Sequence, residues 1–336
     1  MPSTPQPDTP EPRSAEPRSA GPGPAQLDLR RPFTRAQAIA ADIDPRTLRG
    51  PKFRRIFHGV YILAECTLTP QLRAEAALVI HRCRAFASHQ SAARLLDVPV
   101  PDHSDEHVSV FHENDRRRRH GIACHVVAAD ARVGVFRGVP ISMPTRLFIE
   151  LAETLSLVDL GIVGDALVRK GRTTPEELTA ACRDSTERHA QAALRAAEFV
   201  RSGVDSPMET RLRMLIVLAG LPEPDVNHKL YDDRGNLVRR FDLCYPDLKL
   251  LIEYDGRQHA EDPDQYDSDI YRREDLDRWE WRLVIITSKG IYQKPEETLA
   301  RVRRALRERG AKGLPCQFSE EWRAHFPVRQ PVRRPG

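Results

Sequence analysis

The stretch FDLCYPDLKLLIEYDG, residues 241–256, decides how the C-terminal part of the chain folds. Its LLIEY segment is largely apolar, which predicts a buried central strand over residues 249–255. The residues from Tyr245 to Asp247 form a turn that separates this strand from a preceding one over residues 237–245. With a tight turn between them the two strands can lie adjacent, which would bring Asp242 beside Glu253.

The acidic residues of this stretch predict a metal site. Glu253 and Asp255 are two residues apart and point to the same side of the strand. Carboxylates crowded at strand ends repel one another unless a cation or a proton lies between them. Oxygen ligands of this kind suit Mg²⁺ or Mn²⁺, which would polarise a phosphoryl oxygen and lower the pKa of a bound water. These are the requirements of phosphodiester hydrolysis, with Asp242, Glu253 and Asp255 as metal ligands.

The segment SPMETRLRMLIVLAG, residues 206–220, predicts the helix that precedes these strands. Ser206 is the expected N-cap, Pro207 occupies the first helical position and Gly220 ends the helix. Glu209, at the third position, has two open interpretations. It can complete a capping box with Ser206 and pair with Arg213, or it can have a functional role.

The same segments resemble a known nuclease family. SPMETRLR, then FDLCYPDLKLLIEYDGRQH and WRLVIIT are similar to the very-short-patch-repair-endonuclease-like branch of the PD-(D/E)XK nuclease superfamily. The resemblance implies a restriction-endonuclease-like α-β-β-β-α-β core over residues 205–310. It matches Asp242 and Glu253 to the metal-binding acids of the superfamily and Glu209 to the acid of its first helix. Asp255 stands where the superfamily has a lysine that orients the attacking water, and His259 is a candidate for that proton transfer.

Residues 33–65 predict a winged helix-turn-helix. FTRAQAIAADID, with Thr34 as N-cap, and DPRTLRGPKF, with Pro45 at a first helical position, predict two short helices. FRRIFHGVYIL predicts a strand hairpin, or wing. Residues 30–58 hold eight Lys or Arg against two Asp, a net charge of +6. Such a face is typical of phosphate binding, and the alternative is a solvated basic face on a packing module. The candidate DNA-binding residues are Arg46, Arg49, Lys52, Arg54 and Arg55.

Residues 66–200 predict a mixed α/β middle region. Helices are expected over residues 72–83, from Ser88 and from Pro175, and strands at HVSVF, ACHVVAA and GVPI. The segment PTRLFIELAETLSLVDLGIVGDALVRKG predicts one long helix or two consecutive helices. The winged-helix portion with GVY, the SHQSAA segment and MPTRLFIELA resemble AbiEi-family antitoxins. That resemblance implies an N-terminal DNA-binding winged helix.

The composition of the chain limits the class of protein and its location in the cell. Residues 1–32 contain nine prolines and, like residues 327–336, predict disorder. The six cysteines show no CxxC pair and no zinc-finger spacing with histidine, so we expect reduced thiols. No apolar run approaches the roughly 18 residues of a membrane span, and no signal sequence is evident, which predicts a cytoplasmic protein without a membrane partner. The net charge of the whole chain is +4, but residues 205–290 carry a net charge of −6 and residues 301–313 a net charge of +5.

The sequence therefore predicts an α/β multidomain protein with two alternative functions. One is a metal-dependent DNA endonuclease or nickase that the winged helix targets to DNA. The other is a DNA-binding transcriptional regulator or antitoxin-like protein with an inactive nuclease fold. The partner is DNA in both cases, and a homodimer, a cognate toxin or a DNA methyltransferase remain open as further partners.

Overall fold

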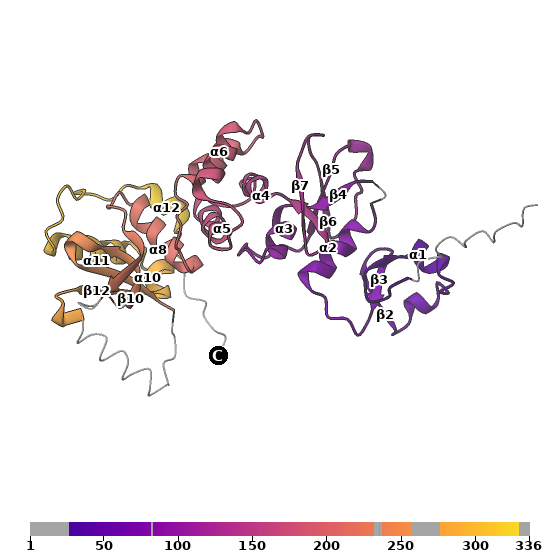
Figure 1. The fold of residues 1–336 in the computed structure, drawn as a ribbon, viewed down its shortest axis with the longest axis horizontal. Coiled ribbons are helices and arrows are strands. Elements are labelled where there is room, and N and C mark those ends of the chain that lie inside the picture. The colour runs from indigo at the N-terminus through magenta and orange to yellow at the C-terminus, as the bar shows by residue number, and fades with distance from the viewer. Residues whose placement is uncertain (1–26, 82, 232–234, 236, 257–275, 329–336) are drawn as a thin grey trace, which may run out of the picture.

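The computed structural model describes residues 27–81, 83–231, 235, 237–256 and 276–328. These residues form an elongated mixed α/β molecule with three sheets. Figure 1 shows the smallest sheet at one end of the molecule and the sheet that follows residue 220 at the other end. Among the described residues no helix is long and apolar enough to cross a membrane.

The first sheet has the strand order β1-β3-β2 and is antiparallel throughout. Thr34 caps the first helix and forms a capping box with Gln37, as the sequence predicts for the cap. The expected second helix is only a single 3-10 turn. Gly50 precedes a proline and is extended (ψ 175°), because the proline ring disfavours helical backbone before it. The elements are β1 Phe33–Thr34, α1 Arg35–Ala40, η1 Thr47–Arg49, β2 Phe53–Phe57 and β3 Val60–Leu63.

The ordered chain begins before Phe33. Leu27 and Leu29 pack against the cluster that contains Phe33, and the Leu29 carbonyl accepts a hydrogen bond from the Leu63 backbone at 3.1 Å. Residues 27–32 therefore belong to the first folded unit and not to the leader that the proline count predicted. Residues 1–26 and 329–336 lie outside the described part of the chain.

The middle sheet has the order β6-β5-β4-β8-β7 and mixes parallel and antiparallel pairs. Its strand β5 is buried at every residue, which places it at the centre of this region. The basic run at residues 116–120 is exposed and precedes β6, as expected for a loop. The elements are α2 Pro70–Leu78, β4 Ala85–Ala87, α3 His89–Leu95, β5 Glu106–Val110, η2 Glu113–Asp115, β6 Ile122–Val126, β7 Val133–Phe136 and β8 Val139–Ser142.

Four helices connect the middle sheet to the last sheet. They are α4 Pro144–Leu151, α5 Leu157–Arg169, α6 Pro175–Asp184 and α7 Ala190–Ala197. The segment after Pro144 forms two helices because Ser156 starts a new one, its hydroxyl accepting the Asp159 N–H at 3.1 Å. Gly164 allows close packing inside α5, since a Cβ there would lie 2.3 Å from Val200 Cγ2.

The last sheet has the order β12-β11-β10-β9, with β10 antiparallel to both neighbours and β11 parallel to β12. The helix expected between β11 and β12 falls mostly on residues 257–275, outside the described residues. The predicted helix before the sheet is present, with Ser206 as its cap and Gly220, at φ 78°, just beyond its end. The elements are α8 Pro207–Leu218, β9 Asp225–Tyr231, β10 Leu237–Tyr245, η3 Pro246–Leu248, β11 Leu250–Asp255, β12 Arg282–Thr287, α10 Ser288–Tyr292, α11 Pro295–Glu308 and α12 Glu321–His325.

The two faces of this sheet carry different clusters. Leu250 and Ile252 pack with side chains of α8 and α11 on one face. Leu251 packs with Phe241 and Leu276 on the other face. The apolar residues of β11 are thus buried on both sides, as the LLIEY pattern predicts for a central strand.

An ion-pair network links α5 to α8. The Arg213 side chain is fully buried and donates to Asp165 Oδ2 at 3.0 Å, to Glu223 Oε1 at 3.0 Å and to the Phe199 carbonyl at 2.7 Å. Asp165 also accepts the Thr210 hydroxyl at 2.8 Å. Arg213 therefore connects the helical region to the last sheet and does not pair with Glu209 as the i,i+4 spacing suggested.

Candidate functional site

Asp242 lies at an irregular point of β10. In a regular strand Phe241, Leu243 and Tyr245 would share a face, but Phe241 packs in the cluster of Leu251 while Leu243 and Tyr245 pack in the cluster of α8. On the neighbouring strand β9, Asn227 has φ 56°. The alternation of β10 is therefore broken between Phe241 and Leu243, although the pairing with β9 keeps one register from Arg239 to Cys244 and its register shift lies between Leu237 and Arg239.

The antiparallel pairing of β10 with β11 brings Asp242 to the predicted neighbours. Asp242 Oδ2 accepts the backbone N–H of Tyr254 at 3.2 Å. This bond places the Asp242 carboxylate next to the peptide that joins Glu253 to Tyr254. Since Ile252 and Tyr254 pack on the α8 side, the alternation directs Glu253 and Asp255 to the opposite face.

Glu209 reaches the same region from the first turn of α8. It is buried, and its Oε2 accepts the Asp205 N–H at 2.9 Å while its own N–H donates to Ser206 Oγ at 3.2 Å. Half of the capping box is thus present, but the reciprocal bond goes to Asp205. Burial raises the pKa of the Glu209 carboxyl, and the negative charge of Asp242 raises it further. Asp242 therefore lies within electrostatic reach of Glu209.

We tested whether these carboxylates fit a divalent cation. Within the described residues, the three carboxylates of Asp242, Glu253 and Asp255 are not a set whose oxygens all lie within 4.8 Å of one another. Mg²⁺ needs only one or two protein carboxylates, because water and substrate phosphate complete its coordination shell. Asp242 with one further acid, Glu253 or Glu209, would supply that number of carboxylates. The donor set therefore suits Mg²⁺ or Mn²⁺ as a two-carboxylate site and not as a preformed three-carboxylate site.

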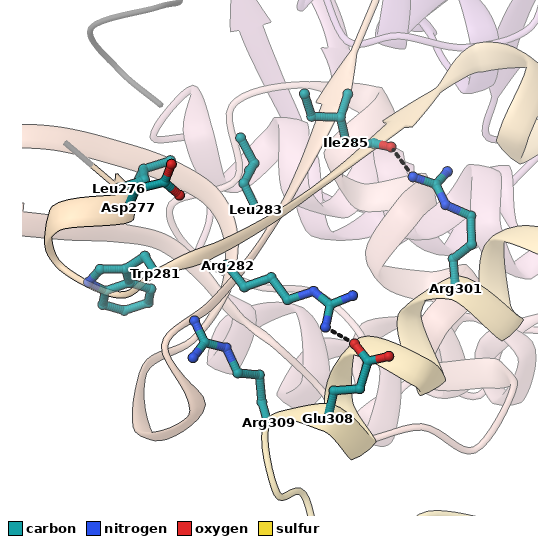
Figure 2. Close-up of a pocket in the computed structure, with 9 residues that line it drawn as sticks. All are labelled: Leu276, Asp277, Trp281, Arg282, Leu283, Ile285, Arg301, Glu308 and Arg309. Carbon is teal, nitrogen blue, oxygen red and sulfur yellow. Dashed lines mark hydrogen bonds and ion pairs between the residues drawn. The ribbon is translucent and has the colours of Figure 1, made fainter. Parts of the chain in front are cut away.

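A hollow with three arginines lies along the edge strand β12 and reaches the face of Glu253 and Asp255 (Figure 2). Its volume is about 750 Å³, and Leu283 and Ile285 of β12 line it. These residues are the register partners of Leu251 and Glu253, and paired residues of parallel strands point to the same side. The remaining lining residues are Leu276, Asp277, Trp281, Arg282, Arg301, Glu308 and Arg309.

Three arginines give this hollow its charge. Figure 2 shows Arg301 donating to the Ile285 carbonyl, at 3.0 Å, and Arg282 paired with Glu308. Arg309 donates to the Lys249 carbonyl at 3.2 Å. Arg301 and Arg309 are thus oriented by backbone carbonyls, and within the described residues neither forms an ion pair with a carboxylate, which suits an approaching phosphate.

The predicted DNA-binding residues lie around η1 and β2. Arg46, Arg49, Lys52 and Arg55 are exposed, whereas Arg54 is half-buried and donates to the Cys66 carbonyl. Within the described part of the chain, none of the four exposed cations forms an ion pair with a carboxylate. The surface is therefore available to phosphates, and Arg54 serves the fold of the unit.

His259 lies outside the described residues, so its predicted role is neither supported nor opposed by the geometry. The sequence interpretation missed a cluster of three histidines in the middle region, His89, His107 and His125. Each stands in a segment that was predicted as a strand or helix start. No sequence spacing signals the cluster, because a parallel strand pair and a helix terminus bring the three together.

No family model matches the chain. Two uncharacterized proteins from two strains of Mycobacterium tuberculosis are similar to it, each 26% identical over 258 residues. The similarity covers 75% of this chain and 92% of either relative.

Proposed function

We propose that this protein is a metal-dependent DNA endonuclease or nickase, with a restriction-endonuclease-like unit after residue 205 and a winged-helix unit before residue 65. The observation that carries the proposal is the position of Asp242. Its carboxylate accepts the Tyr254 N–H beside Glu253, and its charge raises the pKa of the buried Glu209 carboxyl. Asp242 is thus in contact with the backbone of β11 and within electrostatic reach of Glu209 on α8, and a cation beside Asp242 would relieve the repulsion between neighbouring acids.

Each residue has a separate role in the proposed site. Asp242 and Glu253 would hold Mg²⁺ or Mn²⁺, and the ion would supply polarisation of a phosphoryl oxygen when bound. Glu209 is the third acid and anchors the first turn of α8 through its bond to the Asp205 N–H. Asp255 extends the negative charge along the same face of β11.

The hollow with three arginines supports a nucleic-acid substrate. Arg301 of α11 and Arg309 just after it line the hollow at the edge strand β12, and the lining residues Leu283 and Ile285 lie on the face that Glu253 and Asp255 share. A phosphodiester backbone that crossed this face would meet cations and then carboxylates within one surface. That order suits hydrolysis, because the cations bind the flanking phosphates while the acidic site lies at the reacting one.

Cleavage of supercoiled plasmid with Mg²⁺ or Mn²⁺ tests the proposal. We expect nicked or linear product from wild type and a loss of at least 100-fold in the Asp242→Asn/Glu253→Gln double variant. Asp247→Asn is the matched control, since Asp247 is an exposed acid of the turn between the same two strands. It should cleave as wild type does.

Two results would reject the nuclease proposal. Equal nicking by wild type and the double variant would assign the cleavage to a contaminant, and cleavage that persists in excess chelator would exclude the divalent ion. DNA binding by the double variant should be retained, which separates loss of chemistry from loss of binding.

A second candidate function is a DNA-binding regulator or antitoxin-like protein whose nuclease fold is inactive. The exposed cations around η1 favour it, because they suffice for DNA binding without a catalytic site. It predicts salt-dependent binding without cleavage. Neutralising the four exposed cations should lower the slope of log K against log[salt] by about 0.9 for each lost phosphate contact. A neighbouring gene for a nucleotidyltransferase-like toxin would favour this role, whereas one for a DNA methyltransferase would favour the nuclease.

A further inference from the structure

The histidine cluster of the middle region is built by three separate elements. His107 lies on β5, His125 lies on β6 and His89 is the first residue of α3. Strands β5 and β6 are parallel, and the register pairs Ser109 with His125. His107 and His125 are therefore two register positions apart on one face of the sheet.

The three rings of the cluster are stacked, with the His89 and His125 centroids 3.9 Å apart at an interplanar angle of 16° and the His107 and His125 centroids 5.2 Å apart at 13°. His107 Nδ1 and His125 Nε2 are 3.0 Å apart, and one ring nitrogen from each of the three histidines lies within 4.8 Å of the others. Imidazole nitrogens bound at about 2.0–2.1 Å to one tetrahedral ion lie about 3.3 Å apart. Because nearly parallel rings direct their nitrogens along similar directions, His89 would have to turn out of the stack for all three nitrogens to reach one ion.

The environment keeps these imidazoles neutral. Burial lowers the pKa of His89 to about 2 and that of His107 to about 4, with the neighbouring histidines lowering both further. Burial also lowers the pKa of His125. A neutral imidazole is the form that binds a metal ion, whereas a protonated one has no lone pair to donate.

A second layer of polar groups holds the rings. His89 Nδ1 lies 3.1 Å from Ser88 Oγ, and His107 Nε2 lies 3.3 Å from His103 Nδ1. Metal-binding histidines commonly make such a bond with the nitrogen that does not bind the ion, which fixes the tautomer. The pattern leaves His107 Nδ1 directed towards His125.

Two carboxylates lie near His89, of which Glu150 is already paired with Arg146 at 2.9 Å. Glu150 Oε2 lies 3.8 Å from His89 Nδ1 and accepts the His89 backbone N–H at 3.2 Å. Glu153 Oε2 lies 3.7 Å from His89 Nε2 and is nearly half exposed. His89 itself has φ 45°, a conformation that costs energy for a residue with a Cβ. The Glu150 bond to its N–H holds it in that conformation.

The cluster is reachable from solvent. His89 and His125 line a cavity of about 260 Å³, together with Glu153 and Arg146. A site with three protein nitrogens leaves the fourth tetrahedral position open, and Glu153 or a water molecule can occupy it.

We propose that His89, His107 and His125 bind one Zn²⁺ ion in the middle region, with the fourth position on the side of the Glu153 cavity. Nitrogen ligands favour Zn²⁺ over the oxygen-seeking Mg²⁺ of the proposed nuclease site, so the two sites select different ions. The zinc site does not depend on the nuclease proposal, since it lies on a different sheet.

Titration of the metal-free full chain with Co²⁺ and then Zn²⁺ tests this site, in excess Mg²⁺ and after removal of any histidine tag. We expect one equivalent of Co²⁺ with the visible absorption of a tetrahedral ion, displaced by one equivalent of Zn²⁺. His107→Gln and His125→Gln should each weaken binding by at least 10-fold. His112→Gln removes an exposed histidine of the same region and should bind as wild type does.

Thermal unfolding gives the second readout. Zn²⁺ should raise the Tm of wild type and of His112→Gln, and leave the Tm of His107→Gln unchanged, because only a ligand that binds the native state stabilises it. If the wild-type protein binds no stoichiometric metal, the proposal is overturned and the cluster is a stack of neutral imidazoles. Equal binding by wild type and both ligand variants would also overturn it, and the wild-type titration decides the matter even where a variant fails to fold.

Discussion

Replacement of Arg213 by methionine should destabilise the last sheet strongly, because the change leaves a buried carboxylate without its counter-charge. The Arg213 side chain is fully buried, and its partner Asp165 is only 2% exposed. Glu223, the other carboxylate partner, is about one-third exposed and can be hydrated. Breaking a buried ion pair by removing one partner costs about 3–5 kcal/mol. We expect a loss of this size for Arg213→Met.

Denaturant unfolding followed by tryptophan fluorescence measures this loss. All three tryptophans of the chain lie after residue 275, and Trp322 is buried against the cluster of α8. The signal therefore reports on the unit that contains Arg213. Arg195→Ala is the control, since Arg195 and Glu321 form an exposed ion pair between helices. Such pairs contribute about 0–1 kcal/mol.

A second variant and a pH series separate the missing charge from lost packing. Arg213→Met/Asp165→Asn should be more stable than Arg213→Met alone, because no buried charge remains unpaired. Burial raises the pKa of Asp165 even with Arg213 present. A carboxyl with a raised folded-state pKa is stabilised by protonation, so the deficit of Arg213→Met should shrink as the pH falls from 7 towards about 4, the ordinary aspartate pKa. A deficit below 1 kcal/mol, or one that grows on acidification, would refute this account of the network.

Three further predictions address local contacts. Ser206→Ala should cost about 1 kcal/mol in denaturant unfolding, because Ser206 Oγ accepts the Glu209 N–H at the start of α8. Gly164→Ala should lower the free energy of unfolding by about 1–3 kcal/mol, since the added Cβ would lie 2.3 Å from Val200 Cγ2. Adding Val200→Ala to this variant should recover part of the lost stability. If it recovers none, the proposed clash is wrong. Asp242→Asn should lower the pKa of Glu209 in an NMR titration, because the charge of Asp242 raises it; an unchanged pKa would place the two carboxyls too far apart for a shared site.

The sequence predicted those parts of the fold that depend on local chemistry. Ser206, Pro207 and Gly220 fix the ends of α8, and the apolar run of β11 fixes a central strand. The adjacency of Asp242 to β11 was also predictable, since a short turn joins β10 to β11 and leaves few registers. In each case the determining residues lie within about 15 positions of one another.

Long-range pairing could not be predicted in the same way. The spacing of Glu209 and Arg213 suggested an i,i+4 pair, but Arg213 binds Asp165, which is 48 positions earlier in the chain. The histidine cluster depends on the parallel pairing of β5 with β6, which connects residues about 16 positions apart without a hairpin turn. The prediction of a second N-terminal helix was wrong for a local reason, because Pro51 disfavours helical backbone at Gly50.

The three proposed sites use different residues on three sheets, although the first and middle sheets share the apolar cluster of Phe57, Val60, Val108 and Ile122, so each site can be disrupted by its own substitutions. The exposed cations surround the first sheet, the histidines lie on the middle sheet and the carboxylates lie on the last sheet. Mutations far apart with no shared partners have additive effects. Loss of the zinc ligands should therefore leave the salt slope of DNA binding and the cleavage rate unchanged if the ion only stabilises its own sheet. If the zinc-ligand variants also lose cleavage, the middle region must couple DNA binding to the acidic site. The ion-pair network of Arg213 between α5 and α8 is a described contact that could carry this coupling.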